Sequence, residues 1–350
     1  MTDGDAMTPS PSTNGLPRSL ALATLAGAAL AGGCGYPPWT PQRADVNSPP
    51  KMMSSDQVAA GSVLRGRRLL EQGLDKQALA EFERAIENNP LLVGAQMAAG
   101  DIYMKQGDYD MAVLRFGEAA RLAPQSYDAN FKWGSALQAL GQLVDAVRAY
   151  LIALAIKPND PAANMNVGVA YLQLGQAENA LPYADKAVKL DPKSAQAHTN
   201  LGSVFSALGR HEDAVTEYLQ ANELMPPSTK LLLNLADSLQ KAEQFEQAAN
   251  TIDQLIKIEP SAPAYERLGT INFRLRKYDE AQAAFVKAIE LDANYYPALN
   301  GAGICLLNKY IMDKDESARP EALKYLRRSL AVERNQPRIQ GFCDKYRAER

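Results

Sequence analysis

The stretch YDANFKWGSALQALGQLVDAVRAYLIALAIKP, residues 127–158, contains the pattern that decides the fold. Its first half follows the i, i+3, i+4, i+7 spacing of an amphipathic helix at positions 4, 7, 8 and 11. Gly141 then marks a tight turn, because glycine takes positive φ without strain. A second helical run ends at Pro158, since proline lacks the helix donor and restricts the residue before it. The stretch therefore predicts two helices joined by a short turn.

The same pattern recurs eight times, in copies of about 34 residues from Ala59 to Pro337. With each copy numbered from 1, position 20 is always alanine: Ala78, Ala112, Ala146, Ala180, Ala214, Ala248, Ala281 and Ala322. Position 8 never carries more than a methyl group: Gly66, Gly100, Gly134, Gly168, Gly202, Ala236, Gly269 and Gly303. Two helices that cross closely need small side chains where their backbones approach. We therefore expect one close helix pair in each copy.

Three further positions complete the pattern. Position 24 is bulky except at Ala184: Phe82, Phe116, Tyr150, Tyr218, Ile252, Phe285 and Leu326. Position 15 is glycine in the first five copies, and position 32 is proline in all but the seventh. This combination resembles the tetratricopeptide repeat family over residues 59–337. The resemblance implies an all-α fold, a right-handed α-solenoid of about eight helix-turn-helix repeats.

The copies depart from the family pattern at four places. Copy six has Glu243 where the turn glycine is expected and is one residue short, and copy seven has Ala293 in place of proline. Copy four carries Pro182 near the start of its second helix, which is tolerable in a first turn and would kink the helix deeper in. Copy eight has about seven extra residues between its helices, around residues 311–320.

The chain after Pro337 is dense in charge, as expected of a final helix that covers the last apolar face of a solenoid. We therefore expect residues 338–350 to form a C-terminal cap. A frayed terminus is the alternative.

Residues 1–33 have the pattern of a signal peptide. The apolar run from Ser19 to Ala31 follows Arg18 and is too short to cross a hydrocarbon core of ~30 Å as a helix, so a secretory segment fits it better. Small residues then lead to Cys34, and the segment resembles the bacterial lipoprotein signal, in which such a cysteine carries the lipid. The segment departs from that signal at Ala31, where leucine is usual.

The resemblance implies a cell-envelope protein anchored in a membrane through lipidated Cys34. Residues 34–56, rich in proline, are expected to form a tether between the anchor and the repeats. Glycine and tyrosine follow the cysteine, with no aspartate, and this favours the outer membrane over the inner. Plain secretion, an uncleaved anchor and a cytosolic chain are the alternatives, and translation could begin at Met1 or Met7.

The family resemblance further implies that the first helices line a concave groove that receives an extended peptide or a partner protein. Position 6 of these helices places five polar residues on that face in copies three to seven: Lys132, Asn166, Asn200, Asn234 and Arg267. The three asparagines are similar to the asparagine ladder in the repeat domain of O-GlcNAc transferases, because a carboxamide can pair with a peptide backbone of any sequence. The lysine and the arginine would attract acidic partners. Alternatively, these side chains only solvate the helix surface.

Other functions find little support in the sequence. With 37 basic and 40 acidic residues, the chain lacks the basic excess of a nucleic-acid carrier. Neither His198 nor His211 has a metal-ligand partner at helical spacing. Cys305 and Cys343 could form a disulfide between cap and body or remain two buried thiols. No phosphate loop or hydrolase motif is present, so we expect no enzymatic activity, no cofactor and no small-molecule substrate.

The sequence therefore predicts a non-enzymatic scaffold that binds other proteins in the cell envelope, with pilus or secretion assembly as one setting. The alternative is an adaptor that regulates an envelope enzyme such as a peptidoglycan hydrolase.

Overall fold

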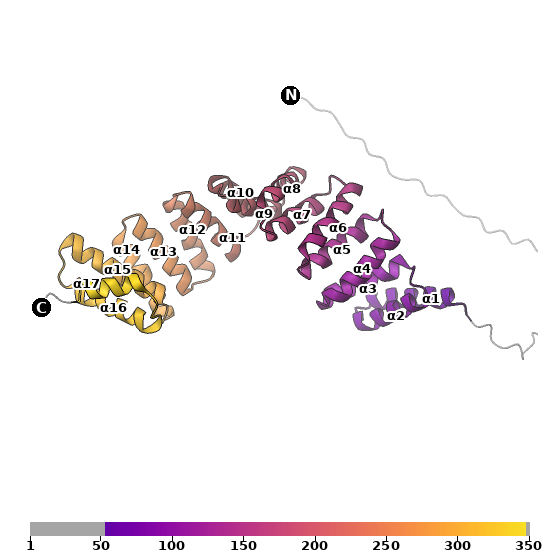
Figure 1. Cartoon of the computed structure of the whole chain (residues 1–350), viewed down its shortest axis with the longest axis horizontal. Coiled ribbons are helices and arrows are strands. Elements are labelled where there is room, and N and C mark those ends of the chain that lie inside the picture. The colour runs from indigo at the N-terminus through magenta and orange to yellow at the C-terminus, as the bar shows by residue number, and fades with distance from the viewer. Residues whose placement is uncertain (1–52, 348–350) are drawn as a thin grey trace, which may run out of the picture. The chain divides into compact units, whose positions relative to one another are not determined.

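The computed structural model describes residues 53–347, and these residues contain helices and no strand (Figure 1). The expected signal peptide, Cys34 and the tether as far as residue 52 lie outside the described residues. The first eight helices are α1 (Ser55–Glu71), α2 (Asp75–Asn88), α3 (Val93–Gln106), α4 (Tyr109–Leu122), α5 (Tyr127–Ala139), α6 (Leu143–Ile156), α7 (Pro161–Gln173) and α8 (Ala177–Leu190). The remaining nine are α9 (Ala195–Ala207), α10 (His211–Leu224), α11 (Thr229–Lys241), α12 (Phe245–Ile258), α13 (Ala262–Arg274), α14 (Tyr278–Leu291), α15 (Tyr296–Asp313), α16 (Ala318–Val332) and α17 (Pro337–Lys345).

Helices α1 to α16 form eight hairpins that stack in chain order, and α17 packs on α16 (Figure 1). The predicted all-α solenoid of about eight repeats with a C-terminal capping helix is therefore confirmed. Odd-numbered helices of successive hairpins also approach one another, as α5 and α7 or α7 and α9 do. Among the described residues, no two even-numbered helices approach to the same degree. We call the surface of the odd-numbered helices the inner face.

The small residue at position 8 makes room for the bulky side chain at position 24 of the same hairpin. A Cβ atom added at Gly134 would lie 2.7 Å from Cδ1 of Tyr150, a ring that is fully buried. At Gly303, in copy eight, the added atom would lie 2.5 Å from Cδ2 of Leu326. The sequence predicted a close approach of two helices at this position, and the structure shows which side chain occupies the space.

The turns keep one backbone conformation whether or not they contain glycine. In the first five hairpins the turn glycine has a φ between 72° and 83°. Glu243 and Arg276 occupy the same position in the next two hairpins, with φ values of 58° and 61°. A residue with a Cβ atom is strained in this left-handed region. The fold therefore imposes the turn even where the sequence does not favour it.

In copies two to five, a buried polar side chain at position 4 bonds the hairpin to the end of the preceding one. Asn130 donates to the carbonyl oxygen of Pro124 at 3.1 Å, and Asn164 donates to that of Pro158 at 3.2 Å. Gln96 and His198 make the same contact six residues back, in copies two and five. These bonds give a partner to the carbonyl oxygen of the proline that follows each helix. Position 4 was predicted as part of an apolar stripe. In four consecutive copies it instead carries a polar side chain that forms a hydrogen bond to the preceding hairpin.

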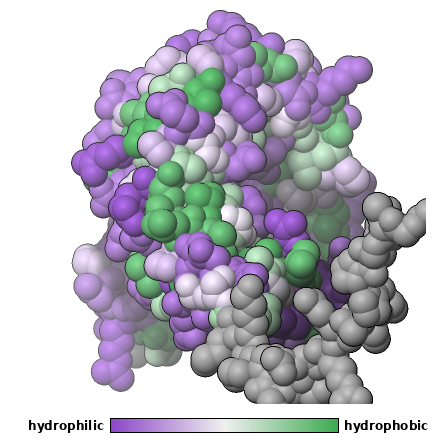
Figure 2. Space-filling view, turned by 90° about the vertical axis from the view of Figure 1, so that its right-hand side faces the viewer, coloured by the Kyte–Doolittle hydropathy of each residue, from purple (hydrophilic) through white to green (hydrophobic). Residues whose placement is uncertain are grey.

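The two ends of the solenoid differ in whether a further helix covers the apolar face of the terminal hairpin. Helix α1 begins at Ser55, before the predicted start at Ala59, because Ser54 and Gln57 form a capping box. Within residues 53–347 no hairpin precedes α1, and Figure 2 shows hydrophobic side chains gathered in a patch on the side that carries α1 and α2. At the other end, Ile339 and Cys343 of α17 are buried against the last hairpin. The cap therefore covers the C-terminal apolar face.

Copies four and eight, which depart from the repeat pattern, still form both of their helices. Most of the extra residues of copy eight lengthen its first helix, so that α15 extends to Asp313 and a short loop leads to α16. Pro182 lies inside α8, beyond its first turn, and the helix continues to Leu190.

Candidate protein-binding face

The five residues predicted to bind a partner all lie on the inner face, one in each of five successive odd-numbered helices. They are Lys132 on α5, Asn166 on α7, Asn200 on α9, Asn234 on α11 and Arg267 on α13. Each side chain is half-buried. The structure thus brings them into one row, as helical spacing and the repeat period predicted. No observation tests whether this row binds a ligand.

In copies three and four, the side chain at position 6 lies against the ring at position 24 of the preceding hairpin. Asn166 donates from Nδ2 to the hydroxyl of Tyr150 at 3.4 Å. The Lys132 Nζ lies 5.9 Å from the centre of the Phe116 ring. A Cβ atom added at Gly301, which holds position 6 in copy eight, would lie only 2.3 Å from Phe285. Position 6 therefore packs against the preceding ring in copies three and four, and in copy eight the ring itself takes the place of the side chain.

The asparagines of the row have hydrogen-bonding capacity to spare. The Asn200 Oδ1 accepts from Gln196 Nε2 at 3.1 Å, but its Nδ2 is buried and has no partner among the described residues. The side chain of Asn234 forms no hydrogen bond within residues 53–347, and Asn166 makes only its long bond to Tyr150. An unsatisfied buried polar group costs about 1–3 kcal/mol. A ligand that supplied acceptors to these amides would recover part of that cost.

The two cations at the ends of the row are not equivalent. Lys132 forms an ion pair with Asp101 of the preceding hairpin, with Nζ at 2.6 Å and 2.7 Å from the two carboxylate oxygens. Its charge is therefore largely balanced within the protein. Arg267 forms no ion pair within the described part of the chain. Of the two, it is the better placed to attract an acidic partner.

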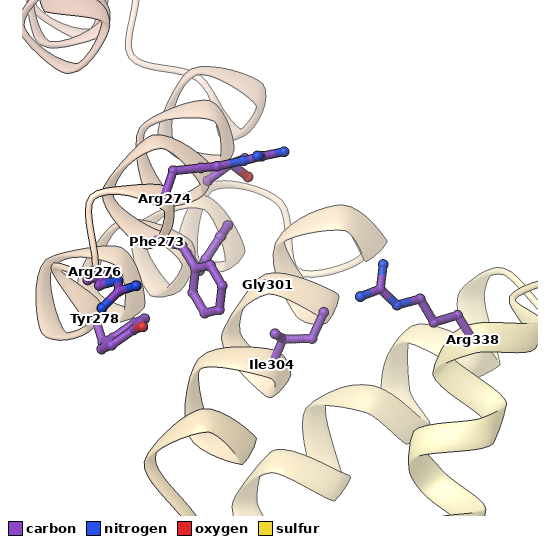
Figure 3. Close-up of a pocket in the computed structure, with 9 residues that line it drawn as sticks. Phe273, Arg274, Arg276, Tyr278, Gly301, Ile304 and Arg338 are labelled. Atoms are coloured by element: carbon purple, nitrogen blue, oxygen red, sulfur yellow. The ribbon is translucent and has the colours of Figure 1, made fainter. Parts of the chain in front are cut away.

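A cavity of about 450 Å³ opens beyond Arg267, between the last two hairpins and the cap (Figure 3). Its lining is aromatic and arginine-rich: Thr270, Phe273, Arg274, Arg276, Tyr278, Phe285, Gly301, Ile304 and Arg338. The sequence analysis did not find this cavity. The available signal was Gly301, a glycine at the position where five preceding copies carry a long polar side chain.

Among the described residues, the buried titratable groups include two tyrosines of the core. Burial raises the pKa of the Tyr150 and Tyr218 hydroxyls, which keeps both neutral as hydrogen-bond partners in the core. Within residues 53–347, no group of three or more His, Cys, Asp or Glu side chains is arranged to hold a metal ion. No helix in this part of the chain is both long and apolar enough to pass through a bilayer.

His198 has a structural role in the position-4 contacts. Its Nε2 lies 3.0 Å from the Pro192 carbonyl oxygen and its Nδ1 lies 2.7 Å from Oε2 of Glu217. Both ring nitrogens are thus occupied by protein groups. The residue is buried between hairpins.

Cys305 and Cys343 are free thiols in the structure, and both are buried. They belong to different clusters, Cys305 with Phe285 and Cys343 with Leu326. Burial raises the pKa of the Cys305 thiol to about 12 and also raises that of Cys343. Of the two possibilities that the sequence left open, the structure has the pair of buried thiols.

Comparison with protein families identifies the class of protein that these features define. Residues 67–299 match the tetratricopeptide-repeat family described as the Cilia and flagella-associated protein 70 C-terminal domain. The chain therefore belongs to this family. Solenoids of this kind bind proteins or peptides, and nothing in the match points to catalysis. A search of curated proteins finds no sequence match.

Solved structures with the same fold include several bacterial repeat proteins. The C-terminal part of a repeat protein from Cytophaga hutchinsonii aligns with a TM-score of 0.59 at 16% identity, covering 69% of this chain and 97% of that one. A tetratricopeptide repeat protein from Parabacteroides merdae has a TM-score of 0.52 at 20% identity, covering 71% and 99%. The pilF protein of Pseudomonas aeruginosa has a TM-score of 0.50 at 18% identity, covering 61% and 97%. At such identities these likenesses establish the fold alone.

Proposed function

We propose that this protein is a non-enzymatic scaffold of the bacterial cell envelope that holds a partner protein or an extended peptide against its inner face. The observation that carries the proposal is the buried, unpartnered Nδ2 of Asn200, in the middle of a row of three asparagines spaced by one repeat. A carboxamide both donates and accepts, so a row of them can pair with the main chain of a ligand without reading its sequence. Arg267, at the end of the row, adds attraction for an acidic group.

The anchor is the second part of the proposal. Cys34 follows a short apolar segment and small residues, so we propose that the mature chain begins with this cysteine and carries lipid. Acyl chains contribute roughly 0.8 kcal/mol per buried methylene, and two or more of them hold a protein stably on a bilayer. The proline-rich residues that follow would space the solenoid from the membrane surface.

A capture experiment tests the inner face. The wild-type chain and a variant with Asn166, Asn200 and Asn234 changed to alanine are immobilised, exposed to envelope extract and analysed by quantitative mass spectrometry. A matched control replaces three asparagines of even-numbered helices, Asn88, Asn179 and Asn250, with alanine. We expect the inner-face variant to lose the partners that the control retains. Equal recovery by all three proteins would refute binding through this row.

The same experiment distinguishes the settings in which a scaffold could act. Recovery of pilus or secretion components identifies an assembly role, whereas recovery of a peptidoglycan hydrolase identifies an adaptor of an envelope enzyme.

The anchor is tested separately by intact-mass measurement of protein extracted from membranes. A wild-type mass raised by acyl chains, lost in Cys34→Ser, is expected, and an unmodified wild-type mass would disprove lipidation.

A further inference from the structure

The cavity next to the cap is lined in part by Gly301, which has no side chain at position 6. In copies three and four the position-6 side chain lies against the ring of the preceding hairpin, as Lys132 does at Phe116 and Asn166 at Tyr150. In copy eight this position is Gly301, and an added Cβ atom would lie 2.3–2.5 Å from three ring atoms of Phe285. The Phe285 ring thus packs against the backbone where a position-6 side chain would stand, and the hollow lies next to this ring.

The walls of the hollow are apolar and come from three elements. Phe273 at the end of α13 packs edge-on against Tyr278 at the start of α14, with ring centres 5.3 Å apart. Ile304 contributes from α15, one helical turn after Gly301. Figure 3 shows the Phe273 ring between α13 and α15. A cavity of about 450 Å³ with such walls fits the size and character of a side-chain pocket.

The rim of the hollow is positively charged. Arg274 and Arg276 border it on one side, and Arg338 reaches toward it from α17 on the other (Figure 3). None of the three guanidinium groups forms an ion pair within residues 53–347, and the lining contains no aspartate or glutamate. Acidic residues lie outside the lining: Glu266 accepts from the Thr270 hydroxyl at 2.9 Å, and Asp279 and Glu280 line a neighbouring pocket with Arg276. Three unpaired guanidinium groups around an apolar floor complement an anion that carries an apolar group.

We propose that this hollow, which we call the cap pocket, binds an acidic peptide segment in which one aromatic or aliphatic side chain is flanked by carboxylates. The apolar side chain enters beside Phe273 and Phe285, and the flanking carboxylates pair with Arg274 and Arg338. The asparagine row then guides the rest of the peptide along the inner face toward α7. This inference rests on the proposed function in one respect only, that the ligand is a peptide.

Binding of short synthetic peptides to the full chain tests the cap pocket. The probe is a labelled five-residue peptide with a central phenylalanine between two pairs of aspartates, and both ends are blocked so that no free terminus contributes. Three comparison peptides replace the phenylalanine with alanine, the aspartates with asparagines, or the aspartates with lysines. Fluorescence anisotropy reports the affinities. We expect the probe to bind about tenfold more tightly than each comparison peptide, because each lacks either the anchor or the charge.

Variants of the rim decide where the probe binds. The double variant Arg274→Glu with Arg338→Glu changes two exposed side chains, so it is expected to fold and to bind the probe at least about tenfold more weakly. The control with Arg68→Glu and Arg84→Glu makes the same change of net charge on the first hairpin, and it is expected to bind as wild type does. Circular dichroism checks that all variants are equally helical.

The outcomes separate this inference from the proposed function. Failure of the probe to bind, or equal binding by the rim variant and wild type, overturns the cap pocket. If inorganic phosphate or the alanine peptide displaces the probe as well as unlabelled probe does, the site is a simple anion site and the inference is wrong. The capture experiment with the asparagine variant stands independently, because it leaves Arg274 and Arg338 unchanged.

Discussion

The glycine at position 8 allows a sharp test, because the same substitution should have different effects in two adjacent hairpins. In hairpin three, a Cβ atom at Gly134 would lie 2.7 Å from Cδ1 and 2.8 Å from Cε1 of Tyr150. The ring cannot easily move away, since it is fully buried and its hydroxyl donates to Gln138 at 2.9 Å. In hairpin four, position 24 is Ala184, and the atom added at Gly168 would lie 3.3 Å from its backbone nitrogen.

The expected magnitudes follow from two opposing effects. Replacing glycine with alanine inside a helix contributes about 1 kcal/mol to the stability of the folded state. Overpacking a core costs about 1–3 kcal/mol. Gly134→Ala is therefore expected to lower the free energy of unfolding by up to ~2 kcal/mol. Gly168→Ala is expected to leave it unchanged or raise it by up to ~1 kcal/mol, because the added atom has no contact shorter than 3.3 Å.

Guanidinium unfolding followed by circular dichroism gives the midpoints of both variants and of wild type. Repeat arrays can lose two-state behaviour, so native-state hydrogen exchange in hairpins three and four complements the midpoints. We expect the midpoint of Gly134→Ala to lie below that of Gly168→Ala. Equal midpoints, or a higher midpoint for Gly134→Ala, would refute the packing of position 8 against position 24.

Three further predictions concern single residues. Glu243→Gly should stabilise the protein by about 0.5–1 kcal/mol, because glycine relieves the strain of a φ of 58° but is more flexible when unfolded; a lower thermal midpoint would contradict this. Asn164→Ala should cost about 1–3 kcal/mol in chemical unfolding, since it removes bonds to the carbonyl oxygens of Pro158 and Asp160, and an unchanged midpoint would show that these bonds contribute nothing. Iodoacetamide should modify Cys305 far more slowly in the native protein than after unfolding, because a thiol with a pKa of about 12 stays protonated at neutral pH, and equal rates would show that it is exposed.

Much of the fold could be predicted from the sequence because the same residue types recur at the same positions of each repeat. Alanine at position 20 and proline at position 32 recur so regularly that the helices and their ends follow from them. The predicted turn also occurs in copies six and seven, where Glu243 and Arg276 take the left-handed conformation without glycine. Packing of neighbouring hairpins thus overrides local preference there.

The contacts between copies could not be predicted in the same way. Position 4 was predicted as part of the apolar stripe, although Asn130 and Asn164 at this position each pair with the proline carbonyl six residues earlier. The cap pocket was missed because Gly301 reads as one more small residue in a chain rich in them. The role of Gly301 in lining the pocket becomes visible only from its neighbours in three dimensions, Phe285 and Arg338. The position-6 row was predicted correctly in place, and its role as a binding surface stays a prediction.

Site-specific photocrosslinking in living cells tests the central claim, that partners bind to the inner face, most directly. A photoreactive amino acid is introduced in place of Asn200 on α9 or, as the control, in place of Asn179 on α8, which is exposed on an even-numbered helix. We predict a defined crosslinked protein from the position of Asn200 and none from that of Asn179. Crosslinks from Asn179 alone, or the same crosslinks from both positions, would contradict the claim.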